Sequence, residues 1–438
     1  MSASDRSKRE RAVSAASAAA KPQADQAGVA ARIDTTRLFA RHMELARHGA
    51  TASGGVDRQA LSPEEFAAWR EVIAWGAQAG LAPSTDAAGN LFLRREGVDA
   101  DAAPVVTGSH LDSQPSGGKF DGVFGVLAGI EAAQAMHDAK VRLRRPLEIV
   151  AWMNEEGSRF APGMMGSAAF TGAAALEQFL PITDAQGITV RAALAALHRE
   201  FAHLPRRELR RPLAAYVEAH IEQGPILERE GYVVGVVTGI QGKRTFRVTI
   251  QGEEAHAGTA EQHERRDALL ASVRMIHALD LAMLEGGDEV KFTVGRLTVV
   301  PNAPSVVAGK AVFSIDLRHV DSTRLAALGD RIPVLCAQHA GPCSVTVAEL
   351  TSARTLEFPE PMRALIRSRA AALGIATRDI FSAAGHDARF LHGVCPTGMI
   401  FVPCKDGISH NPRESAKPEE LAAGARVLAQ TLVALGND

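Results

Sequence analysis

Imidazole and carboxylate side chains occur in short motifs that are widely separated along the chain. The motifs are GSHLDSQPSGGKFDG, WMNEEGSRF, EAHIEQGP and GISHNPRE, and they carry His110, Asp112, Asp121, Glu155, Glu156, His220 and His410. Two divalent cations need roughly four to six ligands each, and a bridging carboxylate lets a few protein groups hold both while leaving room for water. The motifs therefore have the composition of a dinuclear metal centre in a hydrolase.

His110 and Asp112 are two residues apart, so they share one face of an extended segment. A ligating imidazole usually donates its second N–H to a carboxylate or a carbonyl, which makes Asp112 the catalytic-site residue that we expect to orient His110. Asp121 lies in the glycine-flanked turn KFDGVFG, where the backbone can bend closely round an ion. We therefore expect Asp121 to bridge the two metals.

Glu155 and Glu156 are adjacent at the end of a predicted apolar strand. Neighbours on a strand point to opposite sides, so one glutamate can bind metal while the other serves as general base. A divalent cation also acidifies water and polarises a carbonyl group. The pair therefore indicates hydrolysis of an amide, and the residues alone leave open which glutamate has which role.

Each of these motifs has a simpler interpretation when it is taken alone. An isolated histidine is seldom a ligand, and a pair of carboxylates is most often part of a solvated loop. Here, however, each motif ends a predicted buried strand or occupies a glycine-rich turn, where a solvated charge is least expected. Their combination favours the metal centre.

Alternating strands and helices are expected to position the motifs. Residues 33–96 predict two amphipathic helices and one short strand, and Ser62 with Glu65 gives the second helix a start signal. The strand PVVTGSHLD, the helix GVFGVLAGIEAAQAMHDA and the strand PLEIVAWMNEEG follow in β-α-β order. This order predicts an α/β sheet whose working residues lie at the carboxyl ends of its strands.

An inserted domain is indicated after EAHIEQGPILE, where half-buried strands and helices follow in the order of a split β-α-β unit. We expect a flexible leader at residues 1–32, a first catalytic part at 33–236, the insertion at 237–352 and a second catalytic part at 353–438. The insertion is interpreted as a lid on a discontinuous catalytic domain.

The composition of the 438 residues bounds the possible partners. A formal net charge of −2 gives no electrostatic reason to expect nucleic acid or a membrane surface, and no apolar run reaches the roughly 18 to 20 residues that span a bilayer. The four cysteines lack CxxC spacing and are interpreted as structural thiols of a reducing compartment. We therefore expect a cytoplasmic protein that acts on a small substrate.

Together the motifs resemble the dinuclear-zinc amidohydrolases that include N-carbamoyl-L-amino acid hydrolase, β-ureidopropionase and allantoate amidohydrolase, which are related to the metallo-aminopeptidases. The resemblance runs from Ile33 to the C-terminus, with all motifs in family order. It implies an α/β fold with a zinc-aminopeptidase-like catalytic domain and an inserted ferredoxin-like α+β lid and dimerisation domain. The metal ligands that it implies are His110, Asp121 (bridging), Glu156, His220 and His410. Of the two adjacent glutamates, it selects Glu155 as the catalytic base.

The resemblance also implies a set of substrate-binding residues, which are Gln223, His256, Asn302, Arg318, Gly385 and His386. Gln223 would face the carbamoyl end of the substrate, and His256 would also act in catalysis by stabilising a developing oxyanion. Arg318 would bind a carboxylate with two guanidinium nitrogens, although a salt bridge at the end of a strand is its alternative. In the family some of the lid groups reach the active site of the partner subunit, so a homodimer through the lid domain is implied.

Two motifs depart from the usual family sequence. The chain reads HAGTAEQ where relatives commonly read HAGTTPM, and it reads SAAGHDA where SGAGHDA is usual. The metal-binding residues are unaffected, so these departures concern the identity of the substrate.

The expected reaction is metal-dependent hydrolysis of the carbamoyl C–N bond of an N-carbamoyl-L-amino acid or N-carbamoyl-β-alanine, which yields amino acid, CO2 and NH3. Two divalent ions per subunit are expected, with zinc first and manganese, cobalt or nickel as options. Allantoate or ureidoglycolate is the alternative substrate in the same class, and an amino- or dipeptidase is a more distant alternative. A binding module without chemistry is disfavoured because every ligand and Glu155 are present.

Overall fold

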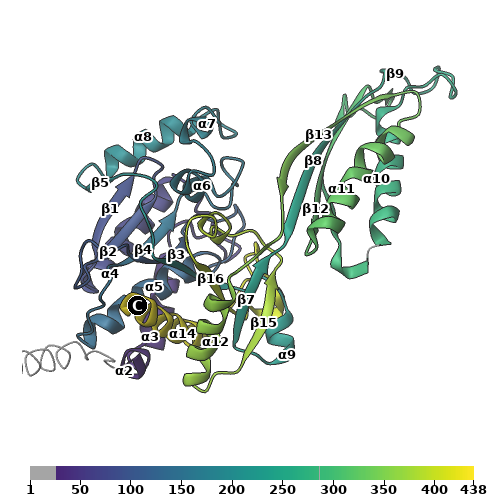
Figure 1. Ribbon diagram of the computed structural model, residues 1–438. Coiled ribbons are helices and arrows are strands. Elements are labelled where there is room, and N and C mark those ends of the chain that lie inside the picture. The colour runs from purple at the N-terminus through teal and green to yellow at the C-terminus, as the bar shows by residue number, and fades with distance from the viewer. Residues whose placement is uncertain (1–25, 286) are drawn as a thin grey trace, which may run out of the picture. The chain divides into compact units, whose positions relative to one another are not determined.

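The structure is a computed structural model that describes residues 26–285 and 287–438. The chain divides into two compact units (Figure 1). Unit 1 comprises the chain up to Val236 together with Pro359–Asp379 and His386–Asp438, and unit 2 comprises Val237–Phe358 and Ile380–Gly385. The leader predicted for residues 1–32 lies mostly outside the described residues. Its last part forms helix α2 (Gln26–Ala30).

A large mixed sheet is built mainly from unit 1. Its strands are β1 (Ala82–Asp86), β2 (Leu91–Arg95), β3 (Val105–His110), β4 (Leu147–Trp152), β5 (Arg206–Arg207), β6 (Ala215–Ile221), β7 (Val234–Ile240), β14 (Leu356–Glu357), β15 (Thr377–Ser382) and β16 (Thr397–Val402). They lie in the order β14-β7-β16-β6-β3-β4-β2-β1-β5, and β15 pairs with β7. This arrangement confirms the predicted α/β fold.

Four adjacent strands at the centre of this sheet, β16, β6, β3 and β4, run parallel to one another. Every residue in them is buried, as expected for strands that helices cover on both faces. The chain passes from β3 to β4 on one side, whereas β6 lies on the other side of β3. Open α/β sheets bind their ligands at the carboxyl ends of the strands where the order reverses in this way.

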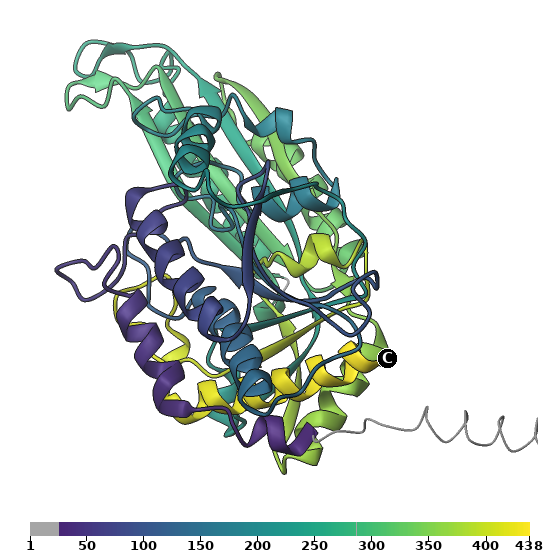
Figure 2. The same ribbon diagram turned by 90° about the vertical axis from the view of Figure 1, so that its left-hand side faces the viewer.

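Helices cover the sheet of unit 1. Besides α2 they are α3 (Thr35–Leu45), α4 (Pro63–Gln78), α5 (Val123–Asp138), α6 (Met165–Thr171), α7 (Leu176–Phe179), α8 (Val190–Glu200), α9 (Ile226–Glu230), α12 (Glu360–Ala372), α13 (Ala388–Leu391) and α14 (Pro418–Asn437). A 3-10 turn, η2 (Lys405–Gly407), follows β16. Helix α14 packs on α2, α3 and α5, and Figure 2 shows these helices together along one side of the unit.

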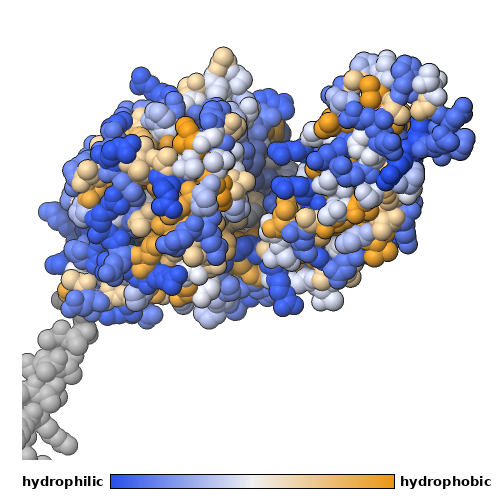
Figure 3. Space-filling view, turned by 90° about the horizontal axis from the view of Figure 1, so that it is seen from above, coloured by the Kyte–Doolittle hydropathy of each residue, from blue (hydrophilic) through white to orange (hydrophobic). Residues whose placement is uncertain are grey.

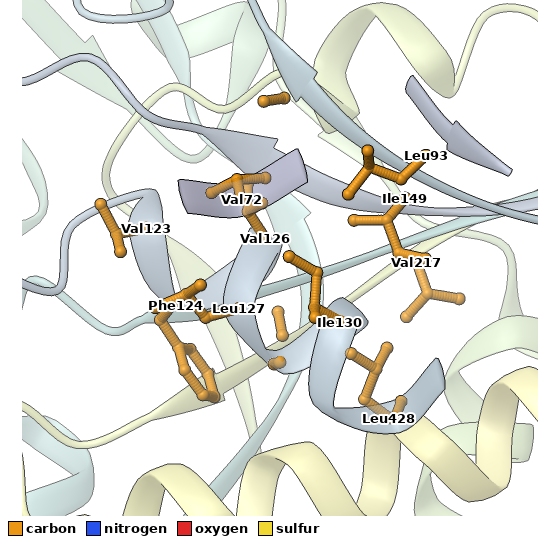
Figure 4. Packing of buried hydrophobic residues seen from close by; sticks show 14 of the residues in the cluster. Val72, Leu93, Val123, Phe124, Val126, Leu127, Ile130, Ile149, Val217 and Leu428 are labelled. Atoms are coloured by element: carbon orange, nitrogen blue, oxygen red, sulfur yellow. The ribbon is translucent and has the colours of Figure 1, made fainter. Parts of the chain in front are cut away.

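Helix α5 is the centre of the core of unit 1. All of its residues from Val123 to Met136 are buried, because it packs on β3, β4 and β6 and on α14. Figure 4 shows Ile130 of α5 in this core with Val217 of β6 and Leu428 of α14. Truncating one such side chain to alanine would cost about 2–5 kcal/mol. A rigid α5 matters for the site, because the turn that begins it carries Asp121.

The segment 33–96 shows where local sequence signals suffice and where they fail. The predicted start of α4 is confirmed, since the Ser62 side chain accepts the backbone N–H of Glu65 at 3.2 Å. The prediction of one strand is incomplete, because the segment forms both β1 and β2. Between them Asp86 accepts the backbone N–H of Asn90, a turn interaction that hydrophobic periodicity does not reveal.

Unit 2 contains a four-stranded antiparallel sheet in the order β10-β12-β8-β13. Its elements are β8 (Gly242–Gln251), β9 (Ala255–His256), α10 (Ala268–Leu284), η1 (Gly287–Glu289), β10 (Lys291–Val300), β11 (Val306–Val307), β12 (Lys310–His319), α11 (Ser322–Gln338) and β13 (Ser344–Ala353). Alternate residues of β8 and β12 form a separate core with α10 and α11. The chain order β8-α10-β10-β12-α11-β13 is that of a split β-α-β unit.

The surface carries both polar and apolar residues. Figure 3 shows hydrophobic residues interspersed with hydrophilic ones on the side seen there. Among the helices that the structure describes, none is long and apolar enough to cross a membrane.

Candidate metal centre

The predicted metal residues lie at the carboxyl ends of the central parallel strands. His110 is the last residue of β3, and His220 is the last but one of β6. Asp121 lies in the loop between β3 and α5, and His410 lies in the loop after β16. Because these strands are parallel neighbours, the sheet collects side chains that are far apart in the sequence.

The Asp121 carboxylate joins two groups of donor atoms. Its Oδ1 lies 3.3 Å from His220 Nε2 and 3.9 Å from His110 Nε2. Its Oδ2 lies 3.2 Å from His410 Nε2, which is 3.3 Å from Glu156 Oε2. Within each group the donor atoms lie within 4.8 Å of one another. A carboxylate whose two oxygens face two donor sets has the geometry to bridge two cations.

The orientation of two imidazole rings fits a cation. His110 Nδ1 lies 2.9 Å from the carbonyl oxygen of Asp112, and His220 Nδ1 lies 2.9 Å from that of Ile221. A ring that donates its Nδ1–H to a carbonyl presents the lone pair of Nε2 on its other side. Both Nε2 atoms face Asp121, so lone pairs and a carboxylate converge in the way that metal ligands do.

The turn after β4 carries the two glutamates. The interpretation that they lie on a strand is wrong, because β4 ends at Trp152 and Asn154 adopts a left-handed φ of 54°. The turn nevertheless gives the two carboxylates different neighbours. Glu155 Oε2 lies 3.6 Å from His110 Nε2, whereas Glu156 belongs to the group with His410.

Asp112 contacts the ring of His110 through its carbonyl, and its carboxylate supports the turn that follows β4. Its carbonyl rather than its carboxylate contacts His110 Nδ1 at hydrogen-bond distance, and the carboxylate Oδ1 is 3.6 Å away. The carboxylate accepts the backbone N–H groups of Glu155 and Glu156, each at 3.2 Å. Asp112 therefore fixes the turn that carries the two glutamates as well as the ring of His110.

Burial and charge shift the pKa values of the site. Burial raises the pKa of Glu155 well above its ordinary value, and the carboxylates of Asp387 and Glu156 raise it further. Burial would raise the pKa of Asp121, but the hydrogen bond with His410 and the neighbouring histidines lower it. The hydrogen bonds to Asp121 and Glu156 raise the pKa of His410 to about 10. This concentration of buried negative charge favours a positive partner, and together with the donor set it fits a divalent cation.

Two residues that the sequence did not single out hold Asp121 in place. Glu414 Oε1 accepts the backbone N–H groups of Phe120 at 2.8 Å and Asp121 at 3.1 Å. Ser409 Oγ lies 3.0 Å from Asp121 Oδ2 and 3.0 Å from Glu414 Oε2. Burial raises the pKa of Glu414 to about 7. Both residues belong to GISHNPRE, the motif that supplies His410. Their place in this motif is the sequence feature that could have identified them as site residues.

Gly122 and Gln114 shape the site beside the predicted ligands. Gly122 has a φ of 65°, and a Cβ at this position would lie 2.3 Å from the His110 ring, so only glycine fits. Gln114 Nε2 donates a hydrogen bond of 2.8 Å to Glu156 Oε2. Such hydrogen bonds to a ligating carboxylate fix its orientation.

Two predicted substrate-binding residues lie next to the predicted metal-binding residues. Gln223 Nε2 donates to Asp121 Oδ2 at 2.9 Å and to Ser409 Oγ at 3.1 Å. His386 is buried, and the centroid of its ring is 4.5 Å from that of His220. Burial and the charge of His220 lower the pKa of His386 well below its usual value.

The other predicted substrate-binding residues, His256, Asn302, Arg318 and Gly385, belong to unit 2. His256 ends β9 and is exposed, and Asn302 is exposed with a left-handed φ of 58°. Their roles in binding substrate stay predictions.

Arg318 makes the salt bridge that was its alternative interpretation. Its Nε and Nη2 atoms lie 2.8 and 3.1 Å from the two carboxylate oxygens of Asp316, and its Nη1 donates to the carbonyl of Ala383. Asp316 also pairs with Lys243 at 3.1 Å. A substrate carboxylate would therefore have to bind the remaining N–H groups of Arg318 or displace Asp316.

An α/β sheet that gathers imidazoles and carboxylates at its carboxyl edge is the arrangement of a metal-dependent hydrolase. The chain belongs to Peptidase family M20/M25/M40, whose sequence model matches residues 106–434. The family resemblance seen in the motifs, and with it the prediction of a hydrolase, is confirmed.

Relatives of known name share most of the chain. An N-carbamoyl-L-amino-acid amidohydrolase of Rhizobium meliloti is 38% identical over 402 residues, which are 91% of this chain and 95% of that protein. An allantoate amidohydrolase of Bacillus subtilis (strain 168) is 34% identical and covers 89% of this chain and 95% of its own. The crystal structure of an amidase of the hydantoinase/carbamoylase family from Burkholderia vietnamiensis is 41% identical, with a TM-score of 0.88 and coverage of 93% and 98%.

Proposed function

We propose that this protein is a metal-dependent amidohydrolase that hydrolyses the carbamoyl C–N bond of N-carbamoyl amino acids to amino acid, CO2 and NH3. The observation that carries the proposal is the pair of donor groups that share the Asp121 carboxylate. The similarity to N-carbamoyl-L-amino-acid amidohydrolases over nine-tenths of the chain supports the choice of substrate.

His110, Asp121 and His220 would hold one divalent ion, and Asp121, Glu156 and His410 would hold the other. Zinc suits these nitrogen and oxygen donors, and manganese, cobalt and nickel are compatible with them. When bound, the ions would acidify water, polarise the ureido carbonyl and favour the ionised form of the surrounding carboxylates.

Glu155 is the proposed general base. Its carboxylate lies beside the ligand His110 but is not needed to complete either donor group. It would take a proton from water as the water oxygen bonds to the ureido carbon, and it would then deliver that proton to the leaving nitrogen as the C–N bond breaks. Asp112, through two backbone N–H groups, would keep Glu155 in position for both transfers.

His256, Asn302, Arg318, Gln223, Gly385 and His386 are the proposed substrate-binding residues. His256 would donate a hydrogen bond to the oxyanion that forms on the ureido carbonyl, and Arg318 would bind the substrate carboxylate. We assign to unit 2 the roles of lid and dimerisation domain.

A homodimer through unit 2 is supported by apolar side chains on one helix. On α10, Leu270, Val273, Leu281 and Leu284 are between 45% and 66% exposed. Residues at this spacing lie on one side of a helix, and a second subunit would remove them from water. Light scattering should give twice the subunit mass, and Val273→Asp with Leu281→Asp should shift it to that of a monomer. A monomeric wild-type protein would contradict the assignment.

Substrate turnover tests the proposal. Metal-loaded protein is assayed for ammonia with N-carbamoyl-L-amino acids, N-carbamoyl-β-alanine, allantoate and ureidoglycolate, and for newly freed amino groups with dipeptides, beside a chelated control. Turnover of an N-carbamoyl amino acid that the chelator abolishes is the expected result. Turnover confined to allantoate or ureidoglycolate would select the second candidate function, which the similarity to an allantoate amidohydrolase favours. Cleavage of dipeptides alone would contradict both.

A further inference from the structure

The backbone around His256 folds back onto its ring. β9 pairs with β11, and the backbone N–H of Ala257 donates to the carbonyl of Ser305 at 3.0 Å. The chain then turns, so that the backbone N–H groups of Gly258 and Thr259 lie 3.0 and 3.2 Å from His256 Nδ1. Two donors thus converge on one ring nitrogen.

These donors determine which nitrogen of His256 carries the proton. A nitrogen that accepts hydrogen bonds from backbone N–H groups has no hydrogen of its own, so in the neutral ring the proton is on Nε2. His256 therefore presents an N–H donor at Nε2. An oxyanion needs such a donor, whereas the opposite tautomer would present a lone pair and repel it.

Arg265 holds the same turn from its other side. Its Nη2 donates to the carbonyl oxygens of Ala257 at 2.7 Å and Ala260 at 2.9 Å, and its Nε donates to Ala260 at 3.1 Å. Within residues 26–285 and 287–438, no ion pair engages its guanidinium. Arg265 also lies two residues before Asp267, whose side chain caps α10, so the turn is close in sequence to a helix end.

We propose that Arg265 is a positioning residue that sets the tautomer of His256. By binding the carbonyls of Ala257 and Ala260, it keeps the N–H groups of the residues between them aimed at His256 Nδ1. The ring is thereby prepared as an Nε2–H donor before substrate arrives. This inference rests on the proposed function, in which His256 stabilises the oxyanion.

Nuclear magnetic resonance of full-length protein labelled with 15N-histidine tests the inference without relying on turnover. The His256 ring signals are assigned by their loss in His256→Gln. Wild-type protein should show Nδ1 as an unprotonated acceptor and Nε2 as protonated. In Arg265→Ala the two ring nitrogens should move towards an averaged state, and Arg265→Lys, whose single ammonium nitrogen must replace both Nε and Nη2, should fall between. Arg266→Ala, a change at the neighbouring exposed arginine, should match wild type.

Kinetics give the second readout. Loss of an oxyanion donor typically costs about 100-fold or more in kcat, so a loosened His256 should lower kcat by about tenfold while KM changes less. An unchanged His256 signal in Arg265→Ala would overturn the inference, whether or not kcat falls. So would a wild-type ring protonated at Nδ1. Wild-type protein without turnover would instead contradict the proposed function. The effect of Arg265 on the His256 tautomer would still be decided by the resonance experiment alone.

Discussion

The Nε2 atom of His410 lies 3.2 Å from the Oδ2 atom of Asp121, although most of the chain separates the two residues. The other oxygen of Asp121 faces His220 at 3.3 Å. This relationship makes Asp121 the one side chain that both donor groups need.

The first prediction concerns Asp121→Asn. An amide has one oxygen in place of two and no charge, so it cannot bridge two cations. The bound metal should fall from two ions to fewer than one per chain, and ammonia release should fall by more than about 100-fold. Plasma mass spectrometry of dialysed protein measures the metal. Asp99→Asn changes an exposed ion pair with Arg144 and is the control, so it should keep the metal content and the ammonia release of wild type.

The second prediction separates the roles of the adjacent glutamates. Glu155→Gln should keep both metals and lose most turnover, by about 100-fold or more, because only the proton-transfer group is removed. Glu156→Gln should lose metal as well as activity, since Glu156 belongs to the donor group with His410. Metal content and kcat are measured on both variants. If Glu155→Gln keeps activity within about tenfold of wild type, another group is the base.

The third prediction concerns the group behind Asp121. Glu414 accepts two backbone N–H groups of the loop and contacts Ser409. Glu414→Gln keeps an oxygen for these N–H groups but replaces Oε2, which contacts Ser409, with an amide NH2. Ser409, and with it Asp121, should lose part of its support, so the metal affinity should fall by about 10–100-fold. Competition with a chromogenic chelator gives the dissociation constants. Glu419→Gln, at the start of α14, should leave the metal affinity unchanged. Equal affinities in wild type, Glu414→Gln and Glu419→Gln would show that Glu414 does not support the metal site.

The fourth prediction is a pH dependence of stability. Burial lowers the pKa of His42 from 6.5 to about 4. The unfolded chain therefore binds more protons than the folded one between these two pH values. The contribution of a neutral His42 to the free energy of unfolding is thus fully present above pH 6.5 and is lost as the pH falls towards 4. Over this pH interval the contribution of His42 to the free energy of unfolding amounts to about 3 kcal/mol.

Urea unfolding of the protein at pH 7, 6, 5 and 4 measures this effect. His42→Leu should flatten the dependence of the unfolding free energy on pH relative to wild type, whereas His263→Leu, at an exposed position, should not. Parallel curves for wild type and His42→Leu would show that His42 does not titrate as stated.

Much of the fold was predictable because it follows from local patterns. The buried strands and the helix of residues 105–152 and the cap of Ser62 can be identified from hydrophobic runs and start signals alone. The pairing of β1 with β2 could not be predicted, because the turn between them is stabilised by a single side chain, that of Asp86. Tertiary contacts of this kind leave no periodicity in the sequence.

The ligand types were predictable, but their exact supports were not. The expectation that the working residues lie at the carboxyl ends of the strands holds for His110 and His220, which lie at the ends of the parallel neighbours β3 and β6. The turn that carries Glu155 and Glu156 begins with a left-handed backbone angle at Asn154, which strand alternation does not encode. The ion pair of Arg318 with Asp316 likewise depends on rotamers.

The most direct test of the central claim is a metal titration of chelated protein, followed by ammonia release from an N-carbamoyl amino acid. If Asp121 joins two catalytic metal sites, the metal-free protein should be inactive, and turnover should rise until two equivalents of metal per chain are bound. Full turnover at one equivalent, or turnover in the metal-free protein, would contradict the dinuclear account.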